Sequence, residues 1–172
     1  MGDAGGDLGE RLVMFRLGEQ ELAAPITAVK ETLAPRALTR AFLVPPALAG
    51  LMNLRGEVIA VLDLAVLLGL PRAASPGGLV LLRNTAGHGK SNRAAAALLV
   101  DQLNGVIDVP RSSLLPVPAI LPPEVAQYLD AVATVSENGG PPRPVMVISP
   151  QRILAAEALR PYSTPRRPSP AP

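Results

Sequence analysis

Few side chains in the sequence have the types and spacing that chemistry requires, and Gly89-Lys90-Ser91 is the most suggestive group. It follows the apolar run 79–82, and a strand followed by Gly-Lys-Ser is typical of a loop that cradles phosphates with backbone amides. The first glycine of that motif would fall at position 84, which is Asn84. The alanine-rich segment 94–103 could form the required helix, but alternating strands and long helices are missing from the pattern. Nucleotide binding is therefore an alternative from another functional class.

Catalytic and metal-binding groups are not apparent elsewhere. His88 is the single histidine and the chain has no cysteine, which excludes a disulfide and a thiolate metal site, and one imidazole is a poor metal site. Asp63 and Asp101 lie at the ends of separate predicted strands, where a carboxylate most simply caps a helix or closes a turn. We therefore expect no catalytic residue, no metal and no cofactor, and we predict that the protein is not an enzyme.

Arg55 lies at the tip of a predicted hairpin. Two apolar runs, 51–54 and 58–62, flank Arg55-Gly56-Glu57, and Gly56 can adopt the left-handed conformation that a tight turn needs. A guanidinium at such a tip offers five donors to carboxylates or carbonyl groups of another protein. This position predicts a protein contact, with a solvated turn arginine as the alternative.

The composition indicates which elements must hold these residues. Hydrophobic residues make up 48% and charged residues 17%, which excludes global disorder, and 20 prolines with 15 glycines favour short strands over a helical bundle. A net charge of +2 leaves too few surplus cations to follow a phosphate backbone, so we expect no nucleic-acid binding. Apolar runs stay well short of the roughly 20 residues that span a bilayer, so we expect no direct membrane insertion. The lack of cysteine is typical of a cytoplasmic protein.

One pattern of apolar and polar residues occurs twice in the sequence. Residues 58–63 and residues 144–149 both contain an apolar strand that ends in a polar residue, Asp63 or Ser149, and both lead into a short helical pattern. Both polar residues are of types that cap helices. A weaker echo pairs Ile26, Val29 and Leu33 with Val100, Leu103 and Ile107. Such repetition predicts a mainly β fold built from two related halves.

The repeat and the turn-rich segments suggest an organisation along the chain. We predict a flexible N-terminus over residues 1–11, one domain over 12–160 and a disordered, proline-rich tail over 161–172. Within the domain the first half spans about 12–74 and the second about 79–158. We expect the halves to pack together and elements to exchange between them, because about 70 residues alone form a marginal core.

The segment 50–64, which contains Asn53-Leu54-Arg55-Gly56, resembles the CheW-like adaptors of bacterial chemotaxis. Weaker similarities to the same family occur over 15–18, 29–31, 99–103 and 145–148. The resemblance covers roughly residues 12–158. It implies two small five-stranded β-barrels packed together, with short helices.

The resemblance also implies a function. Members of the family are non-catalytic adaptors that couple a CheA-type histidine kinase to the cytoplasmic tips of chemoreceptors, and a system other than swimming, such as surface motility or development, is an alternative within the same fold. Barrel faces on either half would contact the kinase. The receptor-facing residues implied for this chain are Val29, Glu31, Asn53, Arg55 and Gly56.

Overall fold

A computed structural model of the chain describes residues 9–71, 75–84, 94–137 and 139–159. Its strands are β1 (Glu10–Leu17), β2 (Gln20–Pro25), β3 (Val29–Leu33), β4 (Leu48–Leu54), β5 (Glu57–Asp63), β6 (Gly78–Arg83), β7 (Ala94–Val100), β8 (Gln102–Val109), β9 (Leu114–Leu115), β10 (Leu129–Val135) and β11 (Arg143–Ile148). The short helices are α1 (Leu64–Leu67), α2 (Pro123–Ala126) and α3 (Pro150–Leu154), with 3-10 turns η1 (Ile26–Ala28), η2 (Arg111–Ser113) and η3 (Glu157–Leu159).

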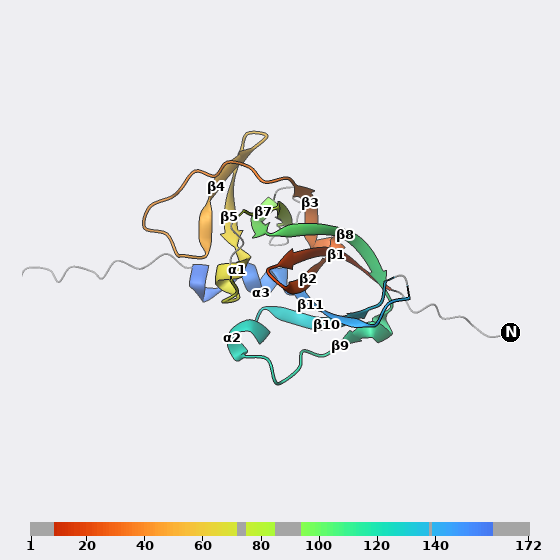
Figure 1. Ribbon diagram of the computed structural model, residues 1–172. Coiled ribbons are helices and arrows are strands. Elements are labelled where there is room, and N and C mark those ends of the chain that lie inside the picture. Colours follow the sequence, from red (N-terminus) through yellow and green to blue (C-terminus); the bar gives the residue numbers. More distant parts are fainter. Residues whose placement is uncertain (1–8, 72–74, 85–93, 138, 160–172) are drawn as a thin grey trace, which may run out of the picture.

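The strands form two packed sheets (Figure 1). One has the order β8-β1-β2-β11-β10-β9 and the other has the order β3-β6-β7-β5-β4. The predicted mainly β architecture of two packed units with short helices is confirmed. The expected pair of five-stranded barrels is correct only loosely: one sheet has six strands, and within the described residues neither ladder closes on itself.

The two sheets repeat one arrangement of strands. The order β8-β1-β2-β11-β10 in the first sheet corresponds to β3-β6-β7-β5-β4 in the second. Each contains two antiparallel hairpins joined by a parallel pair, which is β2 with β11 in one sheet and β7 with β5 in the other. The repeated pattern of the sequence falls on β5 with α1 and on β11 with α3. The weaker echo relates η1 and β3 to the end of β7 and β8. The inference of an internal repeat is therefore confirmed at the level of strand order.

The sheets do not follow the division of the chain near residue 75. Strands β3, β4 and β5 of the first half share a sheet with β6 and β7, and β1 and β2 share the other sheet with β8 to β11. The chain crosses between the sheets after β2, at η1, and again after β7. Exchange between the halves is thus the central feature of the fold.

Asp101 fixes the second crossing. It lies between β7 and β8, its backbone N–H donates to the carbonyl of Arg16 (3.0 Å), and its carboxylate accepts the N–H of Gly18 (2.6 Å). Gly18, with φ of 55°, closes the β1–β2 turn. The side chain of Asp101 therefore joins that turn to the crossing, in keeping with the turn-forming role expected for this residue.

The largest core cluster takes residues from both sheets. It includes Phe15 of β1, Leu62 of β5 and Leu98 of β7, and it extends to α1 and α3 through Leu64 and Ile153. At about 25 cal/mol per Å² of apolar surface removed from water, this shared cluster is a main source of the attraction between the sheets. A single core thus connects the two repeats.

Helix α1 begins as the sequence predicts. The Asp63 carboxylate accepts the N–H of Val66 (3.0 Å), and this bond satisfies one of the free amides of the first turn. In the equivalent place before α3, Ser149 occupies the cap position and Pro150 the first helical position, but the Ser149 hydroxyl makes no capping hydrogen bond. The two caps are therefore equivalent in position and differ in chemistry.

Three places along the chain need comment. Glu10 and Arg11 belong to β1 and pair with Val109 and Asp108, so this strand begins before residue 12. Val58, the first residue of the apolar run 58–62, is 70% exposed, so β5 is open to solvent near its start. The segment 94–100 is strand β7, antiparallel to β6, which removes the helix that the phosphate-loop interpretation needs. Gly89-Lys90-Ser91, His88 and the predicted tail lie outside the described residues.

Candidate functional site

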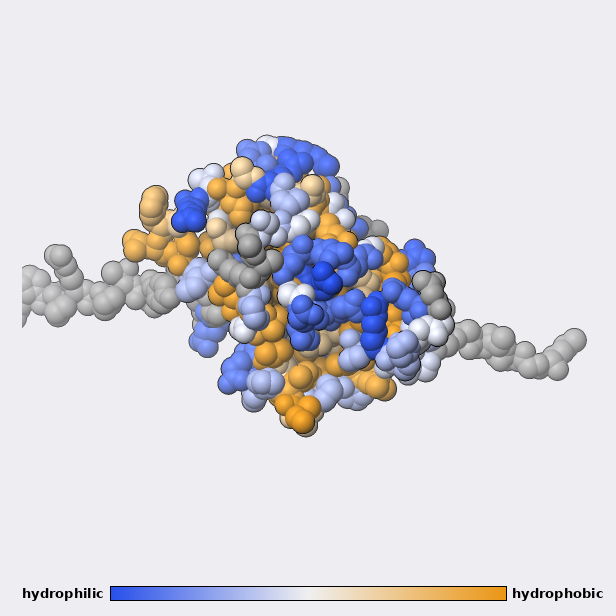
Figure 2. Space-filling view, in the orientation of Figure 1, coloured by the Kyte–Doolittle hydropathy of each residue, from blue (hydrophilic) through white to orange (hydrophobic). Residues whose placement is uncertain are grey.

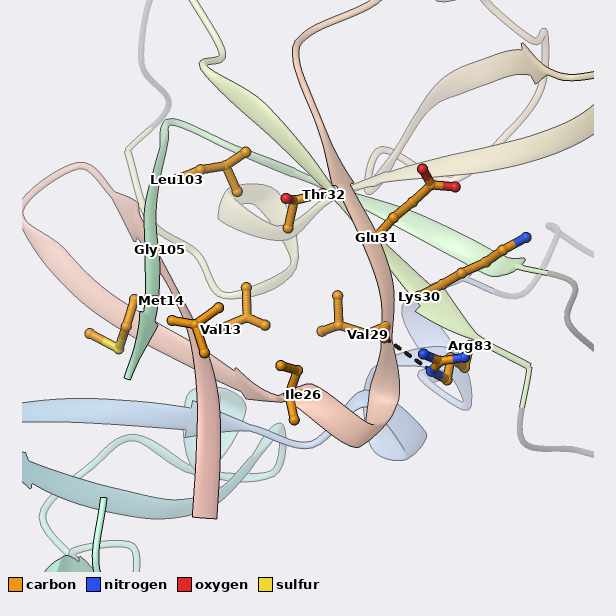
Figure 3. Close-up of a pocket in the computed structure, with 11 residues that line it drawn as sticks. Val13, Met14, Ile26, Val29, Lys30, Glu31, Thr32, Arg83, Leu103 and Gly105 are labelled. Atoms are coloured by element: carbon orange, nitrogen blue, oxygen red, sulfur yellow. Dashed lines mark hydrogen bonds between the residues drawn. The ribbon is translucent and has the colours of Figure 1, made fainter. Parts of the chain in front are cut away.

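A pocket of about 390 Å³ lies where the edge strands of the two sheets face each other. Strands β1 and β8 of one sheet and β3 of the other form its walls, and Arg83 at the end of β6 completes it. Figure 3 shows Val13, Ile26, Val29 and Leu103 gathered around the space between these strands. We call it the inter-sheet pocket. Its apolar floor and charged margin suit a protein segment better than a small polar molecule.

Both edge strands of the inter-sheet pocket carry a β-bulge at the same place. In β3 the residues Val29 and Glu31 pair with consecutive residues of β6, which leaves Lys30 as the extra residue. In β8 the extra residue is Asn104, between Leu103 and Gly105. A bulge re-aims the side chains around it and interrupts regular pairing. The internal repeat therefore extends to the two walls of the pocket.

Arg83 supports the bulge in β3. Its Nε donates a hydrogen bond to the carbonyl oxygen of Val29 (3.0 Å). A buried carbonyl without a partner would cost about 1–3 kcal/mol, so this bond stabilises the irregular backbone. Val29 itself is buried in the core cluster and also lines the pocket. The backbone position of this wall thus depends on a side chain from β6.

Glu31 and Arg55 form an ion pair beside the pocket. Both terminal guanidinium nitrogens of Arg55 lie 3.2 Å from the two carboxylate oxygens of Glu31. The Arg55 side chain is 71% exposed and that of Glu31 is 24% exposed. The geometry is bidentate, which holds the guanidinium in one orientation. An ion pair this exposed contributes little to stability, and Arg55 remains accessible to another protein.

The hairpin that carries Arg55 is tighter than the sequence suggests. Leu54 pairs directly with Glu57, so the turn consists of Arg55 and Gly56 alone. Both residues have left-handed φ, 53° and 86°, as in the turns that match the twist of a two-residue hairpin. The Asn53 side-chain oxygen accepts the N–H of Gly56 (3.0 Å). A non-glycine residue in this conformation costs roughly 1–2 kcal/mol, so the turn holds Arg55 in a strained backbone.

This strain predicts opposite effects of two substitutions at one position. Arg55→Asn should unfold at the same urea concentration as the wild type or a higher one, because asparagine tolerates the left-handed conformation and the lost ion pair is exposed. Arg55→Ala keeps the strain and loses the ion pair, so we expect its free energy of unfolding to fall by about 0.2–1 kcal/mol. Urea denaturation followed by circular dichroism measures both. A lower stability for Arg55→Asn than for Arg55→Ala would contradict the turn geometry.

The structure brings together some of the residues that the family resemblance implied. Val29 and Glu31 line the inter-sheet pocket, and Arg55 joins them through its ion pair with Glu31. Asn53 and Gly56 shape the turn behind Arg55 and do not line the pocket. Other lining residues were not in the predicted set, and they include Lys30, Arg83, Leu103 and Val106. The weak sequence repeat that pairs Val29 with Leu103 was the feature of the sequence that could have indicated β8 as the opposite wall.

Two apolar projections lie away from the inter-sheet pocket. Phe42 and Leu43, in the loop between β3 and β4, are 92% and 94% exposed, and Ile120, in the loop between β9 and α2, is 91% exposed. Figure 2 shows hydrophobic surface projecting where these loops lie in Figure 1. Leu43 also has a left-handed φ of 56°. Large exposed side chains on stiff, proline-rich loops are suited to contacts with other proteins.

The described residues do not suggest another kind of site. No three His, Cys, Asp or Glu side chains among them are grouped so that they could hold a metal ion. None of their helices has the length and apolar character to cross a membrane. Polar side-chain atoms buried in the described part of the chain all have hydrogen-bond partners. Within the described ranges, the inter-sheet pocket and the two apolar projections are surfaces suited to contacts with other proteins.

Known proteins are similar to this chain in sequence. The chain is 28% identical over 127 residues to the probable chemotaxis protein CheW of Rhizobium etli, covering 74% of this chain and 79% of that protein. It is 30% identical over 112 residues to the chemotaxis protein CheW of Rhizobium meliloti, covering 65% and 69%. A third relative, the chemotaxis protein CheW of Klebsiella aerogenes, is 22% identical over 156 residues, covering 91% and 88%.

A solved structure has the same fold. The fold matches the crystal structure of the scaffolding protein TtCheW from Thermoanaerobacter tengcongensis with a TM-score of 0.69 and 20% identity, over 87% of this chain and 90% of that chain. The model of the CheW-like domain matches residues 11–158, which include every strand from β2 to β11 and most of β1. The chain therefore belongs to the CheW-like domain family.

Proposed function

We propose that this protein is a non-catalytic cytoplasmic adaptor that couples a CheA-type histidine kinase to chemoreceptors. The observation that carries the proposal is the inter-sheet pocket, with its Glu31–Arg55 ion pair, in a chain of the CheW-like family. Its relatives are chemotaxis proteins by name. An adaptor needs accessible contact surfaces and no catalytic centre, and the described residues offer such surfaces.

In this proposal the inter-sheet pocket binds the cytoplasmic tip of the receptor. Its floor is formed by aliphatic side chains such as Val29 and Leu103, which can bury the apolar face of an amphipathic helix. Arg55 lies beside the pocket, exposed and oriented by Glu31. Arginine is among the residues that contribute most at protein interfaces. The geometry therefore supports an apolar contact with a directed, charged contact next to it.

The kinase would use other surfaces. The apolar projections at Phe42-Leu43 and at Ile120 are exposed. They lie on equivalent connections of the two repeats, because one lies between β3 and β4 and the other between the equivalent strands β8 and β10. A partner could therefore contact the adaptor without occupying the inter-sheet pocket. Simultaneous binding of two partners is the requirement that any coupling protein must meet.

The proposal predicts that Arg55→Asn weakens receptor-dependent kinase activation without weakening the fold. We expect about a fivefold lower activation at limiting adaptor, because loss of an interface arginine costs on the order of 1 kcal/mol or more. Receptor fragments, kinase and adaptor are mixed, and transfer of phosphate from ATP is followed. Arg40→Asn, at an exposed cation in the β3–β4 loop, is the matched control and should retain full activation. Equal activation by both variants would count against the site, and no activation by the wild type would count against the function.

A further inference from the structure

We propose that Lys30 and Arg83 form a cationic side of the inter-sheet pocket that recognises a carboxylate on the bound receptor segment and so fixes which side of that segment faces β3. The inference rests on the proposed receptor-binding function of the pocket and adds the charge that its partner must carry. It follows from two observations: the two walls of the pocket have equivalent backbones, and the side chains on these walls differ in charge.

The backbone of the pocket has two equivalent walls. Strand β3 on one wall and β8 on the other occupy equivalent places in the two sheets. Val29 and Leu103 come just before the two bulges and both line the pocket, and the extra residues are Lys30 and Asn104. An apolar helix placed between two such walls could bind in either of two orientations with similar contacts. The aliphatic floor alone therefore gives poor discrimination between them.

The charges on the two walls differ. On the β8 side, Lys30 is replaced by Asn104 and Glu31 by Gly105. The one charged residue of β8, Asp108, is bound by Arg11 (2.8 Å), and this hydrogen bond raises the pKa of the Arg11 guanidinium. The β8 wall therefore has little net charge to offer a partner.

The β3 wall has surplus positive charge. Its single carboxylate, Glu31, is neutralised by Arg55. Lys30 has no ion-pair partner among the described residues. Arg83 donates its Nε–H to the Val29 carbonyl, and its terminal nitrogens form no hydrogen bond or ion pair with another described residue. Figure 3 shows Lys30 and Arg83 on the same side of β3, with the dashed bond from Arg83 to the backbone of Val29. Both side chains extend from β3 away from the aliphatic floor, so an ammonium and a guanidinium lie on the outer side of this margin of the pocket.

The occupant that fits these walls is an amphipathic protein segment with an Asp or Glu beside its apolar face. Its aliphatic side chains would contact Val29, Leu103 and Val106, and its carboxylate would reach across β3 to Lys30 and Arg83. Opposite charge favours the orientation that brings the carboxylate to the β3 margin, because the β8 wall offers no comparable cation, and such electrostatic complementarity sets register at interfaces. Lys30 and Arg83 thus act as specificity-determining residues for the partner.

The test uses the full-length adaptor and a soluble fragment spanning the cytoplasmic tip of a chemoreceptor from the same organism. Calorimetry gives the dissociation constant at low and at physiological ionic strength for the wild type, Lys30→Asn and Lys30→Glu. We expect Lys30→Asn to bind about two- to fivefold more weakly and Lys30→Glu at least tenfold more weakly, with a smaller dependence on salt in both. Arg36→Glu, which changes an exposed cation of the β3–β4 loop by the same charge, is the control and should change binding by less than twofold.

A second arm identifies the carboxylate. Acidic residues of the receptor fragment are replaced one at a time by Asn or Gln, and each variant is combined with Lys30→Asn in a double-mutant cycle. The inference requires one acidic residue whose replacement is no longer costly in the Lys30→Asn background. Wild-type binding that Lys30→Glu leaves unchanged would overturn this inference alone. A wild-type adaptor that does not bind the fragment would overturn the proposed function and this inference with it.

Discussion

Leu62→Ala is expected to lower the free energy of unfolding by about 2–5 kcal/mol. Leu62 is 4% exposed and lies in the core cluster that both sheets share. Truncation removes buried apolar surface and leaves a cavity that the neighbouring strands cannot fill, because Leu62 is held between β4 and β7 by its pairing with Leu48 and Leu98. For a domain of this size such a loss lowers the melting temperature by several degrees or more.

The control lies four residues away on the same strand. Val58 is 70% exposed, so Val58→Ala should change the free energy of unfolding by less than about 0.5 kcal/mol. Chemical denaturation of both variants beside the wild type separates burial from strand propensity, since both changes shorten an aliphatic side chain in β5. If Leu62→Ala unfolds at the wild-type denaturant concentration, the side chain does not face the core and the register of β5 is wrong.

Separation of the chain near residue 76 is expected to abolish folding of both pieces. A fragment 9–76 keeps the strands β1 to β5, and a fragment 77–159 keeps β6 to β11. Neither retains a complete sheet, because four ladders, β1–β8, β2–β11, β3–β6 and β5–β7, join strands from opposite fragments. Each fragment would expose the apolar faces that these ladders cover, and about 70 residues supply a marginal core even when intact.

Mixing the two fragments should restore the fold. The severed ladders and the shared core cluster are contacts between the fragments, so these contacts can hold the fragments together without a covalent connection. Association then costs entropy that the intact chain does not lose, because its two halves are already linked. Circular dichroism and amide proton spectra of each fragment and of the equimolar mixture measure the result. Cooperative thermal unfolding of either fragment alone would show that the exchanged strands are not required for a stable half.

The local elements of the fold were predictable because their causes are local. The hairpin at Arg55-Gly56 and the cap at Asp63 depend on residues a few positions apart, and the structure has both. The repeat was visible in the sequence because β5 with α1 and β11 with α3 occupy equivalent positions in the two sheets. Hydrophobic pattern and turn chemistry were sufficient at these places.

The pairing between halves was not predictable from the same signals. An apolar run specifies that a strand is buried but not which strand lies beside it, and the partners of β3 and β8 are set by the crossings at η1 and Asp101. The sequence also predicted a turn at Arg55 that is one residue too long. An arginine with left-handed backbone is uncommon, so the local sequence favoured a three-residue connection centred on the glycine.

The candidate site was predictable in part. The contact between Glu31 and Arg55, 24 residues apart, is consistent with the grouping that the family resemblance implied. Lys30 and Arg83 escaped notice because their placement depends on the one-residue bulge in β3, and a bulge leaves no mark in the hydrophobic pattern when the neighbouring residues are polar. Lys30 and Arg83 can be assigned to the pocket only when the pairing register of β3 with β6 is known.

The matched bulges in β3 and β8 also bear on solubility. Both are terminal strands of their sheets, and a straight terminal strand offers a row of free amides and carbonyls to which further chains can add, as in amyloid growth. An extra residue in each strand breaks the regular spacing of those groups, and Lys30 puts a charge on one of them. The same irregularity that shapes the walls of the inter-sheet pocket therefore protects both sheet edges against the addition of further chains.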